Sequence, residues 1–193
     1  MASDAHVAVL VGLQASGKST FYARCLSGRY ALVSKDLFPR GAKNKQQRQM
    51  RLVEEHLAAG RPVAVDNTNP SPQEWGPLLE LAHTHRAPVT AYWFPPDVAG
   101  SLRRNAARAG RERVPDVGVL ATLKRLRKPS PADGFDEVRE VRFDGRGGFD
   151  VEDEAGTFST TTPPSELAST ARPGWREGIK GARAAFWGNT GNR

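Results

Sequence analysis

A segment near the start of the chain has the residue types of a phosphate-binding loop. Residues 12–19 read GLQASGKS, in which two glycines enclose a four-residue spacer and a lysine and a serine follow. Glycines let successive backbone N–H groups turn toward one anion, and the lysine reaches the β- and γ-phosphates. The pattern predicts a nucleoside-triphosphate site in which Lys18 contacts phosphate and the Ser19 hydroxyl binds Mg²⁺.

The bound nucleotide is expected to be ATP. A purely structural glycine turn is the alternative interpretation, and it would leave Lys18 without a function. Contacts to ATP are predicted for the residues of the loop and the following helix start, and for one carboxylate further along the chain: Gly12, Ala15, Ser16, Gly17, Lys18, Ser19, Thr20 and Asp66.

Two aspartates stand where short apolar segments end. Asp36 comes one residue after ALVS, and Asp66 closes PVAV. If both segments are parallel strands, their carboxyl ends open onto the crevice that also holds the phosphate loop. We expect Asp36 to act as the general base that accepts a hydroxyl proton, and Asp66 to orient water, Mg²⁺ or Lys18. Each also has a simpler interpretation, Asp36 as a helix N-cap and Asp66 as a cap of the loop that follows it.

A run of basic residues suggests a lid over the triphosphate. Arg104 and Arg108 are four apart and would share one face of a helix, and Gly110 would interrupt that helix. Arginines placed this way can neutralise charge that develops during phosphoryl transfer. A solvated basic face is the alternative. Between residues 103 and 128 two acidic residues accompany nine basic ones: Arg103, Arg104, Arg108, Arg111, Arg113, Lys124, Arg125, Arg127 and Lys128.

Strands that alternate with helices must position these groups. Short apolar runs predict strands, and apolar residues at helical spacing predict helices. The expected strands cover residues 7–13, 30–34, 62–66, 89–94 and 134–143, and the expected helices cover residues 20–26, 45–59, 72–84, 97–109 and 116–126. The pattern predicts an α/β protein of the three-layer P-loop kinase type, with a parallel sheet covered by helices on both faces.

One helix carries a clear start signal. Ser71 is the expected N-cap, Pro72 the first helical residue and Glu74 the partner in a capping box. The aromatic residues nearby in sequence fit the core, although a nucleic-acid base stacked on one of them is an alternative. They are Trp75, Tyr92, Trp93 and Phe94.

Composition divides the chain of 193 residues into two parts. Residues 1–150 are the expected kinase domain, and residues 151–193, rich in Ser, Thr and Pro, are expected to be mostly disordered. Residues 151–193 hold five basic and five acidic side chains, so the net charge of +7 lies in residues 1–150. This charge favours a polyanionic partner. No long apolar run or signal peptide is seen, so we expect a cytoplasmic protein with no membrane partner.

The order of these segments resembles a known family. The phosphate loop, VSKD, VAVDNTNP, RRNAAR and PSPADGFDEVREVRF follow one another as in the 5′-hydroxyl polynucleotide kinase domain of polynucleotide kinase/phosphatases. The resemblance implies an ATP- and Mg²⁺-dependent kinase whose acceptor is the 5′-OH end of DNA or RNA. It places Asp36 as the base, and Arg104 or Arg108 as the lid arginine.

The resemblance also implies an acceptor-binding arginine three residues after the base. This chain has Pro39 there, and Arg40 is the nearest substitute. No D-x-D-x-T segment of the family's phosphatase is found, so we expect no 3′-phosphatase activity and possible repair-protein partners. The oligomeric state is not indicated.

Two other functions fit the same motifs. A P-loop kinase could instead phosphorylate a small molecule, such as a metabolite, nucleoside or antibiotic. A non-kinase ATPase switch would hydrolyse ATP without labelling an acceptor. Dependence on salt and on acceptor length separates the first alternative from a nucleic-acid kinase, and the effect of Asp36→Ala on hydrolysis separates the second.

Overall fold

The computed structural model describes residues 4–39, 41–153 and 158–160, which belong to one compact unit. Its centre is a seven-stranded sheet in the order β2-β3-β1-β4-β5-β6-β7. The first five strands in this order are parallel, and β6 and β7 continue the sheet in antiparallel pairs. The strands are β1 (Val7–Val11), β2 (Ala31–Val33), β3 (Val63–Asp66), β4 (Val89–Trp93), β5 (Glu137–Phe143), β6 (Phe149–Asp153) and β7 (Phe158–Thr160).

The central strand β1 is buried along its whole length. It pairs with β3 on one side and β4 on the other, with Val7 opposite both Val63 and Val89. A strand enclosed by neighbours and by helices on both faces has no polar side, which explains the continuous apolar run VAVLV.

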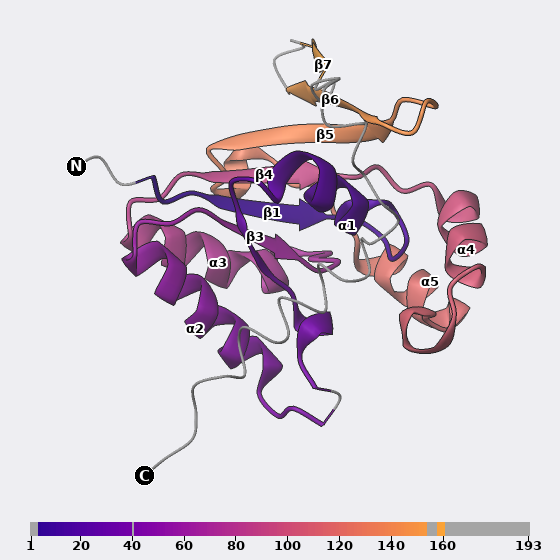
Figure 1. Ribbon diagram of the computed structural model, residues 1–193, viewed down its shortest axis with the longest axis horizontal. Coiled ribbons are helices and arrows are strands. Elements are labelled where there is room, and N and C mark those ends of the chain that lie inside the picture. The colour runs from indigo at the N-terminus through magenta and orange to yellow at the C-terminus, as the bar shows by residue number, and fades with distance from the viewer. Residues whose placement is uncertain (1–3, 40, 154–157, 161–193) are drawn as a thin grey trace. The chain divides into compact units, whose positions relative to one another are not determined.

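Helices cover both faces of the sheet (Figure 1). Helices α2 (Lys45–Ala58) and α3 (Pro72–Thr84) pack on one face through residues such as Val53 and Trp75. The other face is covered by α1 (Lys18–Phe21) and the π-helical turn Tyr22–Leu26 that continues it, with Phe21 and Leu26 in the core. The predicted α/β fold with helices on both faces is therefore confirmed.

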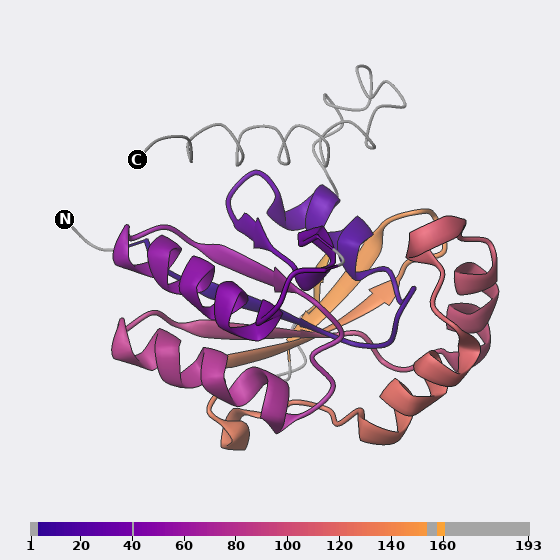
Figure 2. The ribbon, with the colours of Figure 1, turned by 90° about the horizontal axis from the view of Figure 1, so that it is seen from below.

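Helices α4 (Val98–Ala106) and α5 (Asp116–Arg125) lie beyond the carboxyl ends of the parallel strands (Figures 1 and 2). The loops that follow β1 and β3 lie at the same edge of the sheet as α4 and α5. The elements that carry the motifs thus converge at one edge of the sheet, as expected for an open parallel sheet. Among the described residues, no helix combines the length and the apolar character needed to cross a membrane.

The sheet continues past the predicted end of the domain. Strand β5 was expected to be the last, yet β6 pairs with it antiparallel, with Phe149 opposite Phe143, and β7 pairs with β6. The domain expected at residues 1–150 therefore extends at least to Thr160 in the sheet. Most of the tail expected to be disordered, from residue 161 onward, lies outside the described residues.

The predicted capping box of α3 is wrong in its hydrogen bonds. Ser71 is the N-cap and Pro72 the first helical residue, but the Ser71 side chain caps no backbone N–H. Its hydroxyl instead contacts the side chains of Gln73, at 2.7 Å, and Glu74. The carboxylate of Glu74 also pairs with Arg125 of α5, at 2.8 Å. The serine therefore orders an acidic side chain that ties α3 to α5.

Candidate functional site

The predicted phosphate loop links β1 to α1 and depends on its glycines. The N–H of Gly12 donates to the carbonyl of Thr68, at 3.0 Å, and a Cβ on Gly12 would lie 2.8 Å from the Cβ of Phe94. Gly17 has φ of 101°, a conformation that glycine adopts at low cost. The loop is thus shaped by the strand ends around it, and it leads directly into the first turn of a helix, where backbone N–H groups bind anions.

The side chain of Lys18 folds back into the phosphate loop that precedes it. Its ammonium donates to the carbonyl of Gly12, at 3.0 Å, to the carbonyl of Leu13 and to the hydroxyl of Ser16, at 3.2 Å. Only 7% of the residue is exposed. Burial lowers the pKa of Lys18 to about 8, and the carboxylates of Asp66 and Asp36 oppose this shift.

The hydroxyl of Ser19 donates a 2.6 Å hydrogen bond to Oδ2 of Asp66, the last residue of β3. Asp66 is 8% exposed, and burial raises its pKa while the charge of Lys18 and the bond from Ser19 lower it. A hydroxyl and a carboxylate are hard oxygen ligands of the kind that Mg²⁺ takes when it keeps several waters and binds substrate phosphates. These two residues therefore fit Mg²⁺, directly or through water. Within the described residues no larger cluster of His, Cys, Asp and Glu could hold a metal.

Asp36 lies on a short 3₁₀ turn, Lys35–Leu37, directly after β2. Ser34 is the N-cap of this turn, and its hydroxyl accepts from the Asp36 N–H at 3.3 Å, so the alternative of Asp36 as the N-cap is wrong. The Asp36 side chain is exposed. Its negative charge raises the pKa of both Lys18 and Asp66, which places the three charged groups within electrostatic reach of one another.

A network of amides fixes the Asp36 turn, and the motif analysis did not identify it. The Asn67 side chain accepts from the Lys35 N–H, at 3.0 Å, and donates to Oε1 of Gln49, at 2.6 Å. Gln49 is 1% exposed on the apolar face of α2, in step with Leu52 and Val53. A polar residue at a core-facing helical position was the available signal, because such a group is buried only when it has a partner.

Asn69 holds the loop after β3. Its side chain donates to the carbonyl of Leu10, at 2.8 Å, and to that of Val65, at 3.3 Å. The segment DNTNP thus bridges the ends of β1 and β3, which keeps Asp66 beside the phosphate loop.

Arg104 contacts the phosphate loop directly. Its Nε donates to the carbonyl of Ala15, at 2.8 Å, and its guanidinium pairs with Asp97, at 3.3 Å. The guanidinium carbon also lies 5.3 Å from the ring centre of Phe143. Arg104 is therefore held at the outer rim of the loop.

Arg108 lies elsewhere on the lid, and the predicted shared helix face is wrong. Helix α4 ends at Ala106, so Arg108 falls in the following loop, where it donates to the carbonyl of Glu112 at 3.3 Å. The positive charge of Arg108 lowers the pKa of both Lys18 and Asp66. The charge of Arg108 therefore reaches the phosphate-loop lysine and Asp66.

The segment that was predicted to form a lid is anchored by buried contacts. The Asn105 side chain is fully buried, and it donates to the carbonyl of Val114, at 2.6 Å, and accepts from its N–H, at 3.0 Å. Gln14 of the phosphate loop donates to Thr122 of α5, at 2.9 Å. Residues 107–113 connect the end of α4 to these contacts and include the 3₁₀ turn Gly110–Glu112, in which Gly110 has φ of 58°.

Other predicted residues are placed less centrally. Ser16 is buried within the loop and Thr20 is exposed on α1. Arg40, the predicted acceptor-binding residue, lies outside the described residues. The aromatics predicted to be in the core are buried there, between 1% and 6% exposed: Trp75, Tyr92, Trp93 and Phe94. The exposed aromatic at this edge is instead Phe143, which sequence reasoning did not select.

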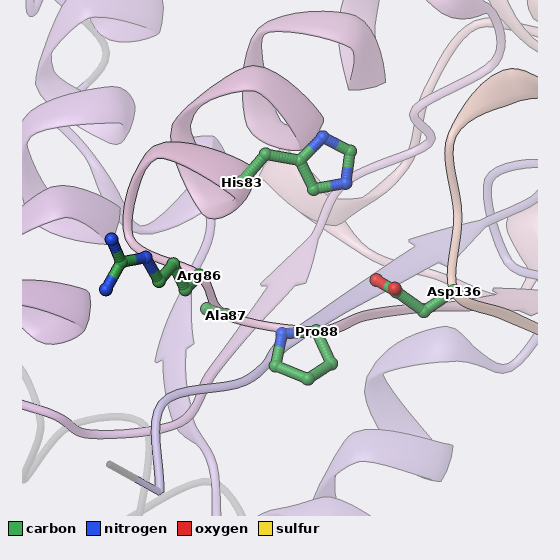
Figure 3. Close-up of a pocket in the computed structure, with 5 residues that line it drawn as sticks. All are labelled: His83, Arg86, Ala87, Pro88 and Asp136. Atoms are coloured by element: carbon green, nitrogen blue, oxygen red, sulfur yellow. The ribbon is translucent and has the colours of Figure 1, made fainter.

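A pocket of about 240 Å³ is separate from this site (Figure 3). It is lined by His83, Arg86, Ala87, Pro88 and Asp136. The carboxylate of Asp136 accepts from the N–H of Val89, the first residue of β4, at 2.7 Å. The pocket therefore lies at the amino end of β4, the opposite end from the phosphate loop, and the guanidinium of Arg86 lies on the side away from His83 and Asp136 (Figure 3).

Comparison with known proteins places the chain in a family. A family model described as an AAA domain matches residues 7–129. The bifunctional polynucleotide phosphatase/kinase of Schizosaccharomyces pombe is 24% identical over 141 residues, which are 71% of this chain and 33% of that protein. The chain thus spans one third of the length of this relative. The resemblance inferred from the motifs is confirmed, at low identity.

Solved structures of kinases share the fold. A gluconokinase from Sinorhizobium meliloti 1021 matches with a TM-score of 0.50 and 19% identity, over 70% of this chain and 81% of that chain. A fungal RNA kinase matches with a TM-score of 0.52 and 16% identity, over 72% of this chain and 38% of that chain. At these identities the likeness establishes the P-loop kinase fold.

Proposed function

Because the chain belongs to the AAA domain family, whose model matches residues 7–129, we propose that it is an ATP-dependent kinase of 5′-hydroxyl ends of DNA or RNA. One observation carries the proposal. The exposed carboxylate of Asp36 follows β2, Asp66 ends β3 and the phosphate loop follows β1. These three strands are parallel neighbours, so a hydroxyl presented to Asp36 would lie at the same edge of the sheet as the terminal phosphate held by the loop.

The residues divide the chemistry between them. The loop N–H groups and Lys18 bind the β- and γ-phosphates, and Ser19 and Asp66 would hold Mg²⁺, which would neutralise phosphate charge. The oxygen of the acceptor hydroxyl attacks the γ-phosphorus, and Asp36 takes the proton of that hydroxyl. The bond from the γ-phosphorus to the bridging oxygen breaks, and ADP leaves. Arg108 stabilises the charge on the transferred group.

The acceptor class rests on two supports. The polynucleotide phosphatase/kinase of S. pombe is similar over 71% of this chain. The whole net charge of +7 falls in residues 1–150, which suits a polyanionic acceptor. A small-molecule hydroxyl is the second candidate, since the fold also matches a gluconokinase and the donor side of the site would be the same.

Transfer from γ-labelled ATP tests the proposal. The acceptors are 5′-OH DNA and RNA oligonucleotides of several lengths, nucleosides and small metabolites, each with the wild type, Lys18→Ala and Asp36→Ala. The expected result is labelled oligonucleotide, lost in both variants, with transfer that weakens as salt rises and strengthens with acceptor length. Label on small metabolites alone would favour the second candidate. Hydrolysis without any label, spared in Asp36→Ala, would indicate an ATPase switch.

A further inference from the structure

We propose that Phe143 and Arg104 form the stacking site for the nucleobase of the donor nucleotide, an inference that rests on the proposed nucleotide site. Phe143 is the last residue of β5 and is 47% exposed. An aromatic ring with this exposure at the edge of a binding loop is available to a ligand.

The ring lies against the phosphate loop itself. A Cβ built on Gly17 would come within 2.5 Å of Cζ of Phe143, so the edge of the ring contacts the residue that precedes Lys18. The ribose is the only group between the α-phosphate and the base of a nucleotide. A triphosphate held by the loop therefore carries its base to within reach of this ring.

The ring is held in place from beneath. Phe143 packs on Phe149 of β6, with ring centres 5.0 Å apart and planes inclined by 30°, and Phe149 packs on Phe21 of α1, with centres 5.3 Å apart. Phe149 is 4% exposed and belongs to the core. A ring fixed by core neighbours loses little conformational entropy when it binds a ligand.

Arg104 supplies the second surface. Its guanidinium lies 5.3 Å from the Phe143 ring centre, and a planar guanidinium stacks on aromatic faces. Its pairing with Asp97 joins two side chains that are 35% and 59% exposed, so this ion pair opposes a shift of the guanidinium only weakly, while the 2.8 Å bond from Nε to the carbonyl of Ala15 keeps the side chain at the loop. Arg104 is thus assigned to the base, and Arg108 to the phosphates.

Binding of base-containing and base-free ligands tests this assignment. Calorimetry with Mg²⁺ compares ADP with inorganic tripolyphosphate for the wild type, Phe143→Ala, Phe143→Leu and Phe143→Tyr. We expect Phe143→Ala and Phe143→Leu to weaken ADP binding by roughly 5- to 100-fold, as stacking contributions imply, with tripolyphosphate binding unchanged. Phe143→Tyr keeps the ring and should bind ADP as the wild type does.

Arg104→Ala should show the same loss for ADP alone, and Arg103→Ala, the adjacent exposed arginine of α4, is its matched control. The inference would be overturned if the variants bound ADP and tripolyphosphate equally more weakly, or if the Phe143 variants bound ADP as the wild type does. It would also be overturned if the wild type did not bind ADP. Phe143→Leu retains apolar packing on Phe149, and circular dichroism verifies folding. The calorimetric measurement uses no acceptor. It therefore tests the stacking site even if the oligonucleotide assay shows no transfer.

Discussion

The hydroxyl of Ser19 lies 2.6 Å from Oδ2 of Asp66, and this hydrogen bond joins the first turn of α1 to the end of β3. The two residues are 47 positions apart in the chain, yet their oxygens form the pair best suited to Mg²⁺ in the described part of the site.

Ser19→Ala and Asp66→Asn should each raise the Mg²⁺ concentration needed for half-maximal ADP binding, by roughly 10- to 100-fold, the range found when groups that support a metal are removed. Ser27→Ala is the control, because the Ser27 hydroxyl donates only to the carbonyl of Ala23, at 2.8 Å, at an exposed position. An unchanged Mg²⁺ requirement in both variants would exclude the pair as the metal site.

Lys18→Met should stabilise the protein at neutral pH. Burial lowers the pKa of Lys18 from its usual value to about 8, so the folded state holds fewer protons than the unfolded state between about pH 8 and the ordinary lysine pKa. Burial of the ammonium therefore lowers the free energy of unfolding, and this loss has its full size below about pH 8. The loss becomes smaller as the pH rises from about 8 to the ordinary lysine pKa. We expect Lys18→Met to raise the free energy of unfolding by about 1 to 3 kcal/mol at pH 7 and by much less at pH 10.

Urea unfolding at both pH values measures this difference, and Lys43→Met, at an exposed position, serves as the control. A gain in stability that is the same at pH 7 and pH 10 would show that Lys18 is not held with a lowered pKa. Loss of ADP binding in Lys18→Met should accompany the gain.

Arg108→Ala should reduce the rate of phosphoryl transfer by about 10²- to 10³-fold with little change in ADP affinity, because its charge acts on the groups around the phosphates. Arg108→Lys should recover part of the rate. Arg113→Ala, another exposed arginine of the same loop, should behave as the wild type. Single-turnover kinetics with labelled ATP separate transfer from binding, and equal rates for Arg108→Ala and Arg113→Ala would contradict the assignment.

Asn105→Ala should loosen the base of the lid. Its side chain makes two hydrogen bonds to Val114 in a fully buried position, so the expected loss is about 1 to 3 kcal/mol in the free energy of unfolding. Trypsin should cleave faster within residues 106–113. Ser101→Ala is the control, since the buried Ser101 hydroxyl has no hydrogen-bond partner among the described residues and its removal costs nothing. Unaltered cleavage in Asn105→Ala would show that the clamp does not restrain the lid.

Much of the fold could be predicted because its signals are local. The helix expected at residues 45–59 is observed as Lys45–Ala58, and the apolar runs around Val9 and Val65 became parallel strands. The antiparallel end of the sheet was missed, although Phe149 and Val151 alternate with acidic residues after a glycine-rich turn. That pattern is typical of a hairpin strand, but residues 151–153 fall in the part of the chain whose composition indicates a disordered tail.

The site was predicted less completely, because several of its contacts join distant parts of the chain. The phosphate loop and the two aspartates follow from residues next to strand ends. The Gln49–Asn67 bond and the contact of Phe143 with Gly17 depend on tertiary packing, which periodicity does not encode. Arg104 and Arg108 have the spacing of residues on one helix face, but α4 ends at Ala106, so Arg108 lies outside the helix.

The packing of Phe143 and Phe149 beside the phosphate loop has a consequence for synthesis of the protein. The loop leaves the ribosome before the rings beside it, which lie more than 120 positions later in the chain, since Gly17 contacts Phe143 and Phe21 contacts Phe149. A nascent chain that ends at residue 129, where the family match stops, carries every phosphate-binding residue and lacks the side wall of the cradle. Nucleotide affinity should therefore arise late in translation, once the β5–β6 hairpin has emerged and closed on α1.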